Sequence, residues 1–109
     1  MKELEHDIPE TMSGYHKMKR NHSMDGALNA KTKELIALGI SLVTKSEGCI
    51  TTHLHHALER GATRNEILEV LSVAVMMGGG PVLIYAAQVM EAFDQLEEVK
   101  QPARLYDHA

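Results

Sequence analysis

The stretch SEGCITTHLHHALERGAT, residues 46–63, decides how this chain is expected to fold. Its first three residues interrupt an apolar pattern. A helix is predicted to begin near Cys49 and to end at Gly61, because glycine is favoured just after a helix. Thr63 then opens a Thr-x-x-Glu sequence that closes at Glu66, the pattern of a capping box. The stretch therefore predicts one complete helix and the first turn of the next.

Apolar residues on either side of this stretch predict further helices. Upstream, Asn29 is the predicted N-cap of a helix that runs to about Lys45 with an apolar stripe. Downstream, a helix over residues 64–77 ends at a run of glycines, and Pro81 suits the first turn of another helix to about Glu98. No alternating strand pattern competes with these signals. The fold class is therefore all-α, a bundle of about five helices.

The chain divides into three predicted parts. Residues 1–28 are polar and contain Pro9, Gly14 and Gly26, which favours a short helix or an arm that packs on the main body. Residues 29–100 hold the helical domain, and residues 101–109 look like a tail.

The helix predicted over residues 64–77 is apolar on most faces. Such a helix must be buried almost all round, and a domain of this size offers little room for that. A subunit interface, and hence a homo-oligomer, is the expected solution. Met76 and Met77 near its end are most simply explained as core filler.

Bulk composition limits the classes of function. The chain has 109 residues, enough for one domain, with 44% hydrophobic and 24% charged residues. Its net charge of −4 gives no basic excess for nucleic acid and has the wrong sign for an anionic membrane. The charged start is unlike a secretory signal, and one cysteine cannot form an internal disulfide. We therefore expect a cytoplasmic protein that binds neither nucleic acid nor membrane.

Cys49 is the first candidate for chemistry. At the start of a helix, the helix dipole and free backbone amides stabilise a thiolate. His53 follows four residues later on the same helical face, where an imidazole can take or return a proton. Ser46, three residues before Cys49, can offer a hydroxyl. By spacing alone, a buried structural cysteine and a surface histidine fit equally well.

Glu34 and the neighbouring histidines are weaker candidates by spacing. Glu34 follows three polar residues, so a solvated helix face is its default environment. His53 and His56 lie one turn apart and can share a metal ion. No second cluster follows at ligand spacing, however, and zinc sites usually take three or four protein ligands. We therefore predict neither a metal site nor a bound cofactor.

The chain resembles the carboxymuconolactone decarboxylase family, and within it the alkylhydroperoxidase-D-like proteins. These carry Cys-x-x-Cys-x-x-x-His-x-x-x-Ala-x-x-x-Gly-Ala-Thr, then Glu-Ile and an apolar helix that ends in a Gly-Gly-x-Pro-like sequence. The matching segments here are residues 46–63, Glu66-Ile67 and residues 76–81, and residues 31–38 match upstream. The similarity covers roughly residues 27–96. It implies an all-α fold that assembles as trimers or hexamers.

The resemblance also implies roles for particular residues. In the redox-active members the two cysteines form a reducible pair, and the histidine relays protons with an upstream glutamate. By position, Cys49 matches the second cysteine, His53 the histidine and Glu34 the glutamate. Ser46 occupies the place of the first cysteine, so the internal disulfide cannot form. An external thiol would then resolve a sulfenic acid on Cys49. A substitution made to trap a reduced state would leave the same sequence.

The first functional hypothesis is a thiol-dependent peroxidase or disulfide reductase of oxidative-stress defence. It acts on a small peroxide or disulfide and takes electrons from an external thiol or dithiol. Its catalytic residues are the nucleophile Cys49, the acid/base His53, the relay or orienting residue Glu34, and Ser46 as a hydrogen-bond partner of the sulfur.

Two other functions stay open. A lactone decarboxylase, the other branch of the family, needs no thiol and again uses His53. Nearby polar groups would hold the carboxylate of its substrate, but few cations lie near the motif, and Lys45 and Arg60 are the closest in sequence. The third hypothesis is a non-catalytic helical assembly module, suggested by the serine at position 46.

Overall fold

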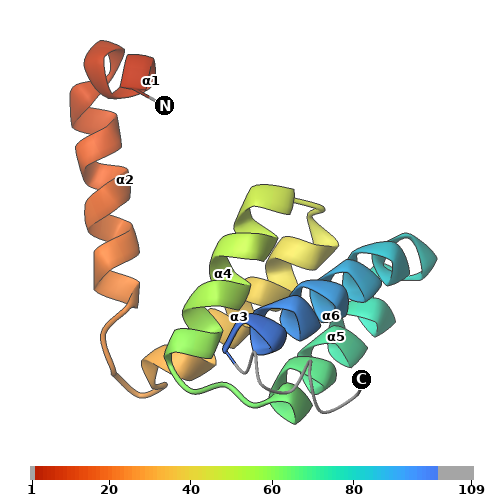
Figure 1. The fold of residues 1–109 in the computed structure, drawn as a ribbon. Helices are drawn as coiled ribbons and strands as arrows, with labels where there is room; N and C mark the ends of the chain where they lie inside the picture. Colours follow the sequence, from red (N-terminus) through yellow and green to blue (C-terminus); the bar gives the residue numbers. More distant parts are fainter. Residues whose placement is uncertain (1, 101–109) are drawn as a thin grey trace.

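The computed structural model describes residues 2–100, which form six α-helices and no strand within that range (Figure 1). Helices α3 to α6 form the body, and α1 and α2 project from it as an arm (Figure 1). The predicted all-α fold is confirmed, and the predicted tail at residues 101–109 lies outside the described residues. The helices are α1 (Lys2–Asp7), α2 (Pro9–His22), α3 (Ala30–Val43), α4 (Glu47–Glu59), α5 (Arg64–Gly78) and α6 (Gly80–Lys100).

Capping side chains begin α3 and α5 where the sequence predicts. Oδ1 of Asn29 accepts a hydrogen bond from the amide of Thr32 at 2.8 Å. At α5 both halves of the capping box form. The Glu66 amide donates to Oγ1 of Thr63 at 3.1 Å, and the Thr63 amide donates to the Glu66 carboxylate at 2.8 Å. These two helix starts are therefore confirmed.

The turn between α3 and α4 is tighter than predicted. Lys45 adopts a left-handed conformation with φ 58°. The amide of Ser46 then donates to the carbonyl of Ser41 at 3.0 Å, the closing bond of a Schellman motif. Ser46 is already the N-cap residue, so α4 begins at Glu47 instead of near Cys49. Cys49 consequently lies inside the first turn of the helix.

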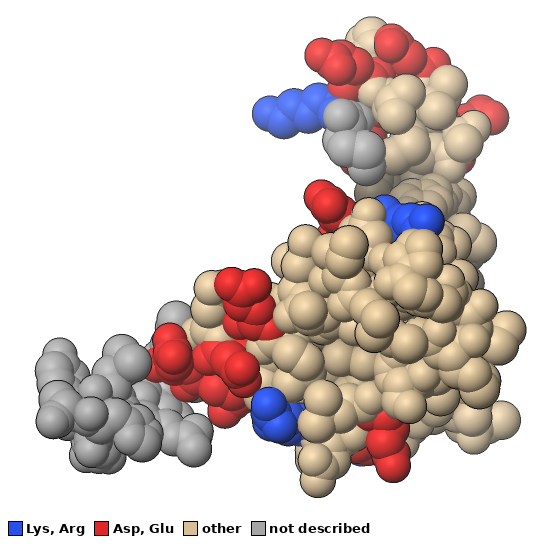
Figure 2. Space-filling model, turned by 90° about the vertical axis from the view of Figure 1, so that its right-hand side faces the viewer, with Lys and Arg blue, Asp and Glu red and all other residues tan. Residues whose placement is uncertain are grey.

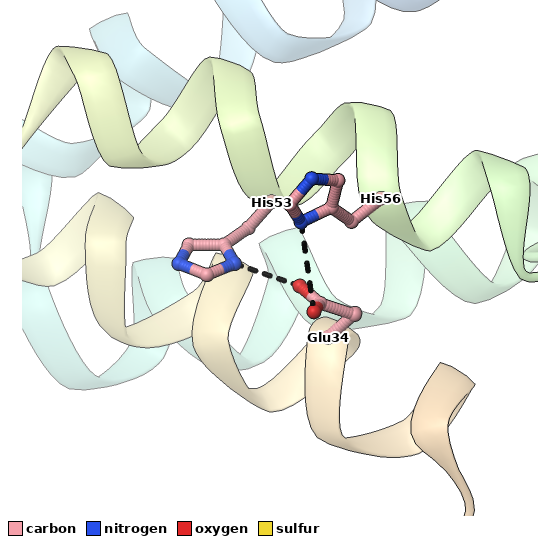
Figure 3. Close-up of side chains that lie close together, drawn as sticks. All are labelled: Glu34, His53 and His56. Carbon is pink, nitrogen blue, oxygen red and sulfur yellow. Dashed lines mark hydrogen bonds and ion pairs between the residues drawn. The ribbon is translucent and has the colours of Figure 1, made fainter. Parts of the chain in front are cut away.

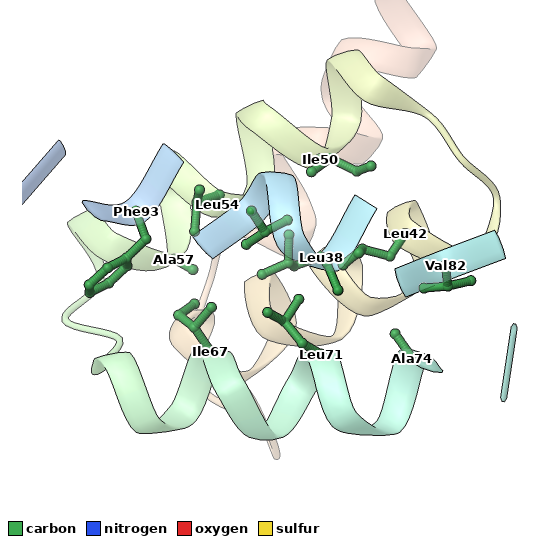
Figure 4. Packing of buried hydrophobic residues seen from close by; sticks show 12 residues of the cluster. Leu38, Leu42, Ile50, Leu54, Ala57, Ile67, Leu71, Ala74, Val82 and Phe93 are labelled. Atoms are coloured by element: carbon green, nitrogen blue, oxygen red, sulfur yellow. The ribbon is translucent and has the colours of Figure 1, made fainter. Parts of the chain in front are cut away.

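One apolar core lies among the four body helices (Figure 4). Helix α3 contacts α4, α5 and α6, and is therefore the central element. Burial of each large aliphatic side chain contributes about 1.5–3 kcal/mol. The packing holds α3 and α4 side by side, which positions the polar residues at their contact. The fully buried side chains are Leu38, Leu42, Leu54, Ile67, Val82 and Val89.

Helices α5 and α6 meet at a corner built from glycine. Gly79 has φ 75°, a conformation that strains any residue with a Cβ. A Cβ at Gly78 would collide with the side chain of Val82, which is itself part of the core. Pro81 lies in the first turn of α6 as predicted, where its missing N–H has no helical partner to lose.

The outer side of α3 and α5 exposes apolar side chains. Met76 and Met77 are 73% and 71% exposed, so the prediction that they fill the core is wrong. A groove of about 670 Å³ runs between the two helices. In Figure 2, charged side chains gather on the arm and at the borders of the body. Although the side chains exposed along this groove are apolar, no helix within residues 2–100 is both long enough and apolar enough to cross a bilayer. Aliphatic residues that line the groove include Ile36, Ile40, Val43, Val70, Val73 and Met77.

Candidate active site

Glu34 lies in the second turn of α3 and is only 3% exposed. The prediction that Glu34 lies on a solvated helix face is therefore wrong. A buried carboxylate costs several kcal/mol unless it is paired and hydrogen-bonded. Both of its oxygens have partners, and all of these partners are histidines. The carboxylate is thus the centre around which the polar residues gather.

Two histidines of α4 point at this carboxylate (Figure 3). Nδ1 of His53 donates a hydrogen bond to Oε2 of Glu34 at 2.7 Å, because an ionised carboxylate can only accept. Nδ1 of His56, one turn along the helix, lies 3.7 Å from Oε1. Their spacing places both imidazoles on one face of α4, and the rigid packing of α3 against α4 brings that face over Glu34.

A third histidine reaches Glu34 from the arm. Nε2 of His22, the last residue of α2, donates to Oε1 of Glu34 at 3.1 Å. The loop between α2 and α3 is closed by the Ala30 amide, which donates to Oδ1 of Asp25 at 2.7 Å. His22 is not among the site residues that the sequence predicts. Its approach depends on how this loop closes, for which helical periodicity gives no signal.

Two opposing influences set the pKa of Glu34. Burial raises it, because the charged carboxylate loses water. The hydrogen bond and charge of His53 lower it, with further lowering from His22 and His56. The net result is a pKa below the ordinary value for glutamate. Glu34 is therefore an ionised, fixed anion at neutral pH.

A cavity of about 270 Å³ opens beside these histidines. Lys19 and Arg20 of α2 line it, and neither forms an ion pair within the described part of the chain. The cations that lie nearest the motif in sequence, Lys45 and Arg60, do not line it. The fold thus brings different cations to the site from those the sequence suggested. The full lining is His16, Lys19, Arg20, His22, Ser23, His53 and His56.

Cys49 is an exposed free thiol in the first turn of α4. The alternative of a buried structural cysteine is therefore wrong. Cys49 precedes His53 by one turn on the same face, but no hydrogen bond joins the two side chains in residues 2–100. Ser46 caps α4 without a side-chain hydrogen bond to its amides. The structure thus joins Glu34 to His53, and the catalytic roles of all four residues stay predictions.

The order of these features along the chain matches a known family. A sequence model of the carboxymuconolactone decarboxylase family matches residues 9–92. The chain belongs to this family. The matched range begins in α2 and therefore includes the helix that supplies His22. The division into an arm of residues 1–28 and a domain of residues 29–100 stays a prediction.

Solved carboxymuconolactone decarboxylase family proteins share this fold. One from Legionella pneumophila is 43% identical with a TM-score of 0.78, over 85% of this chain and 83% of its own. One from Thermotoga maritima is 28% identical with a TM-score of 0.80, over 84% of this chain and 95% of its own. The Thermotoga protein is described as having a possible role in the antioxidative response.

A similar relative with no assigned activity extends this comparison. An uncharacterised protein of Cupriavidus necator is 36% identical over 81% of this chain and 78% of its own. The predicted family and all-α fold are thus confirmed, and enzymatic activity is in keeping with the family.

Proposed function

We propose that this protein is a thiol-dependent peroxidase or disulfide reductase. The observation that supports it best is the 2.7 Å hydrogen bond between His53 and the buried Glu34, on a helix that presents Cys49 one turn earlier. A buried anion that orients an imidazole, beside an accessible thiol at a helix start, is the arrangement of an activated cysteine. The antioxidative description of the Thermotoga relative agrees with this chemistry.

The proposed reaction begins with attack of the Cys49 thiolate on a peroxide. A sulfur–oxygen bond forms, the oxygen–oxygen bond breaks, and the departing alkoxide takes a proton to leave as an alcohol. Cys49 is then a sulfenic acid. One external thiol converts it to a mixed disulfide with release of water, and a second thiol releases the disulfide and restores Cys49. The balance is one peroxide and two thiols to one alcohol, one water and one disulfide.

Glu34 and His53 supply the proton in this scheme. Because Nδ1 of His53 is bound to Glu34, the other ring nitrogen, Nε2, is the one free to exchange a proton. Glu34 holds the ring in that orientation and stabilises the imidazolium. Ser46 cannot resolve the sulfenic acid, so the reducing thiol must come from outside the chain. The cytoplasm, the compartment expected from the sequence, supplies such thiols.

A lactone decarboxylase is the second candidate, and the cavity favours it. Lys19 and Arg20 lie beside His53 and are suited to hold the carboxylate of such a substrate. Release of carbon dioxide from a carboxymuconolactone, abolished by His53→Ala and unaffected by Cys49→Ser, would establish this reaction. If neither reaction occurs, the non-catalytic assembly module is the remaining hypothesis.

We also infer that the protein works as a homo-oligomer. Monomers rarely expose contiguous apolar patches larger than a few hundred Å². Here Ile40, Val73 and Met77 are more than half exposed around one aliphatic groove. A second copy of the chain offers the same aliphatic chemistry in return. The family resemblance makes trimers or hexamers the expected assemblies.

The test is consumption of an alkyl hydroperoxide by the full chain with a small thiol as reductant. Cys49→Ser should abolish turnover, and His53→Ala should lower it by about 10²–10⁴-fold. Ser46→Ala tests the predicted hydrogen-bond partner of the sulfur, because it removes the neighbouring hydroxyl and keeps the thiol, and it should lower turnover less than Cys49→Ser does. Cys49 should also be alkylated faster at neutral pH than a cysteine in an unfolded peptide, and more slowly in His53→Ala. Turnover that survives Cys49→Ser would refute the proposal.

A further inference from the structure

We propose that Glu34, His53 and His56 form a binding site for a divalent transition-metal ion, with Zn²⁺ as the simplest occupant. One ligand atom from each residue can be chosen so that all three lie within 4.8 Å of one another. Imidazole and carboxylate are the ligands that zinc and iron share in proteins. The sequence offered only the two histidines of α4, and the fold adds the third ligand from α3.

The distances suit a tetrahedral ion. With metal–ligand bonds of about 2.0–2.2 Å, neighbouring ligand atoms stand about 3.4 Å apart. Nδ1 of His56 lies 3.7 Å from Oε1 of Glu34, and Nδ1 of His53 lies 2.7 Å from Oε2. The two distances are to different oxygens of the carboxylate, and one ligand atom from each residue can be chosen with all three within 4.8 Å, so the side chains must rotate to close around one ion. In the metal-bound form each neutral imidazole would carry its proton on Nε2 and offer the lone pair of Nδ1 to the ion, so His53 would lose the Nδ1 proton that it now donates to Glu34.

The surroundings complete such a site. His22 donates to Oε1 of Glu34 at 3.1 Å, and metal-binding carboxylates are typically held by a hydrogen bond of this kind. His53 and His56 also line the cavity of about 270 Å³, which leaves space for water or a small ligand at a fourth position. Three protein ligands with one open position are typical of catalytic zinc sites. The single charge of Glu34 offsets part of the charge of the ion.

Metal binding has a consequence for the proposed thiol chemistry. The ion would take Nδ1 of His53 and a carboxylate oxygen of Glu34, the groups now joined by a hydrogen bond. The metal-bound form and the proton relay therefore exclude each other. This consequence rests on the proposed peroxidase function, whereas the metal site itself rests only on the ligand geometry.

The experiment is calorimetric titration of the full chain, without a purification tag, with Zn²⁺, supported by the visible spectrum of bound Co²⁺. One ion per chain is expected. His56→Gln should weaken binding by more than 100-fold, and His22→Ala by about 10-fold, the loss typical of an outer hydrogen-bond partner. His55→Gln is the matched control, because His55 is exposed and pairs with Glu59 at 2.8 Å. It should bind as the wild type does, and so should Cys49→Ser.

Three results would overturn the site. These are the absence of Zn²⁺ binding, unchanged binding in His56→Gln, and loss of binding in His55→Gln or Cys49→Ser equal to that in His56→Gln. His56 is only half-buried, so its replacement tests the ligand without emptying a core position. The titration uses no peroxide, and the peroxidase assay is run with a chelator. Each proposal can therefore fail while the other stands.

Discussion

The two sides of α3 break the usual rule of burial in opposite ways: one side buries a charged residue, and the other exposes apolar residues. Towards α4 the helix buries the charged Glu34 among histidines, and towards the outside it exposes Ile36 and Ile40. A buried charge and an exposed apolar patch are the informative exceptions in a folded protein, because each costs stability unless something offsets the cost. The buried charge of Glu34 is offset by hydrogen bonds from His22 and His53. The exposed apolar patch has no partner within residues 2–100, and this contrast is the basis for proposing chemistry on one side of α3 and assembly on the other.

The largest expected effect comes from a charge on the apolar side. Ile40→Asp should dissociate the oligomer, because an unpaired carboxylate buried at an interface costs at least about 3 kcal/mol, more than 100-fold in the dissociation constant. Light scattering at micromolar concentration measures the mass. Gln95→Glu adds the same charge to an exposed part of α6 and should leave the assembly intact. A wild-type chain that is already monomeric would contradict the proposal that the apolar side of α3 is a subunit interface.

A smaller effect is expected from removing the charge on the polar side. Glu34→Gln should lower the free energy of unfolding by about 2 kcal/mol, because hydrogen bonds to a charged group contribute about 1.5–3 kcal/mol. Urea denaturation measures this best in the Ile40→Asp background, where assembly does not contribute. Ile36→Gln, two residues along the same helix, should change the value by less than about 0.5 kcal/mol. If Glu34→Gln and Ile36→Gln lowered the free energy of unfolding equally, the proposed difference between the two sides of α3 would be contradicted.

The smallest effect is a pH dependence on the polar side. The pKa of Glu34 is lowered in the folded chain, so its ionised form stabilises the fold. This contribution is complete above the unfolded glutamate value of about 4.3 and is lost as the pH falls through the lower folded pKa. The difference in unfolding free energy between wild type and Glu34→Gln should shrink as the pH falls below about 4.3, because the Glu34 carboxylate becomes protonated there. A difference that grows towards low pH would reverse the sign of the shift.

The wild type must be compared with Glu34→Gln because folding also lowers the pKa of a second carboxyl group. Glu66 also has a lowered pKa, through its hydrogen bond to Lys31 at 2.9 Å and its place in the capping box. Its contribution is present in both proteins and cancels in the difference. The remaining signal therefore belongs to the polar side of α3.

The helices could be predicted because their signals are local. Asn29, Thr63 and Pro81 act within one turn of their own positions, and the structure uses all three as expected. The burial of Glu34 could not be found this way, because its partners come from other helices. For the same reason no local pattern indicated that His22 approaches it.

Apolar periodicity failed in a different way. It shows that a side chain avoids water without showing what covers it. Met76 and Met77 therefore resembled core residues, although the fold of one chain leaves them exposed. The candidate residues Cys49 and His53 could be located from the sequence and the family resemblance, whereas their environment depended on the packing of α3 against α4.

The Schellman turn at Lys45 is a connection of fixed length between α3 and α4, and it fixes how α4 is rotated about its axis relative to α3. Glu34 lies before this turn and His53 after it, and their contact requires a definite rotation of α4 relative to α3. Each residue added to or removed from a helix rotates the residues beyond it by about 100°. Surface loops usually tolerate insertions and deletions. In this loop a change of one residue should swing His53 away from Glu34, so the site depends on the length of the loop.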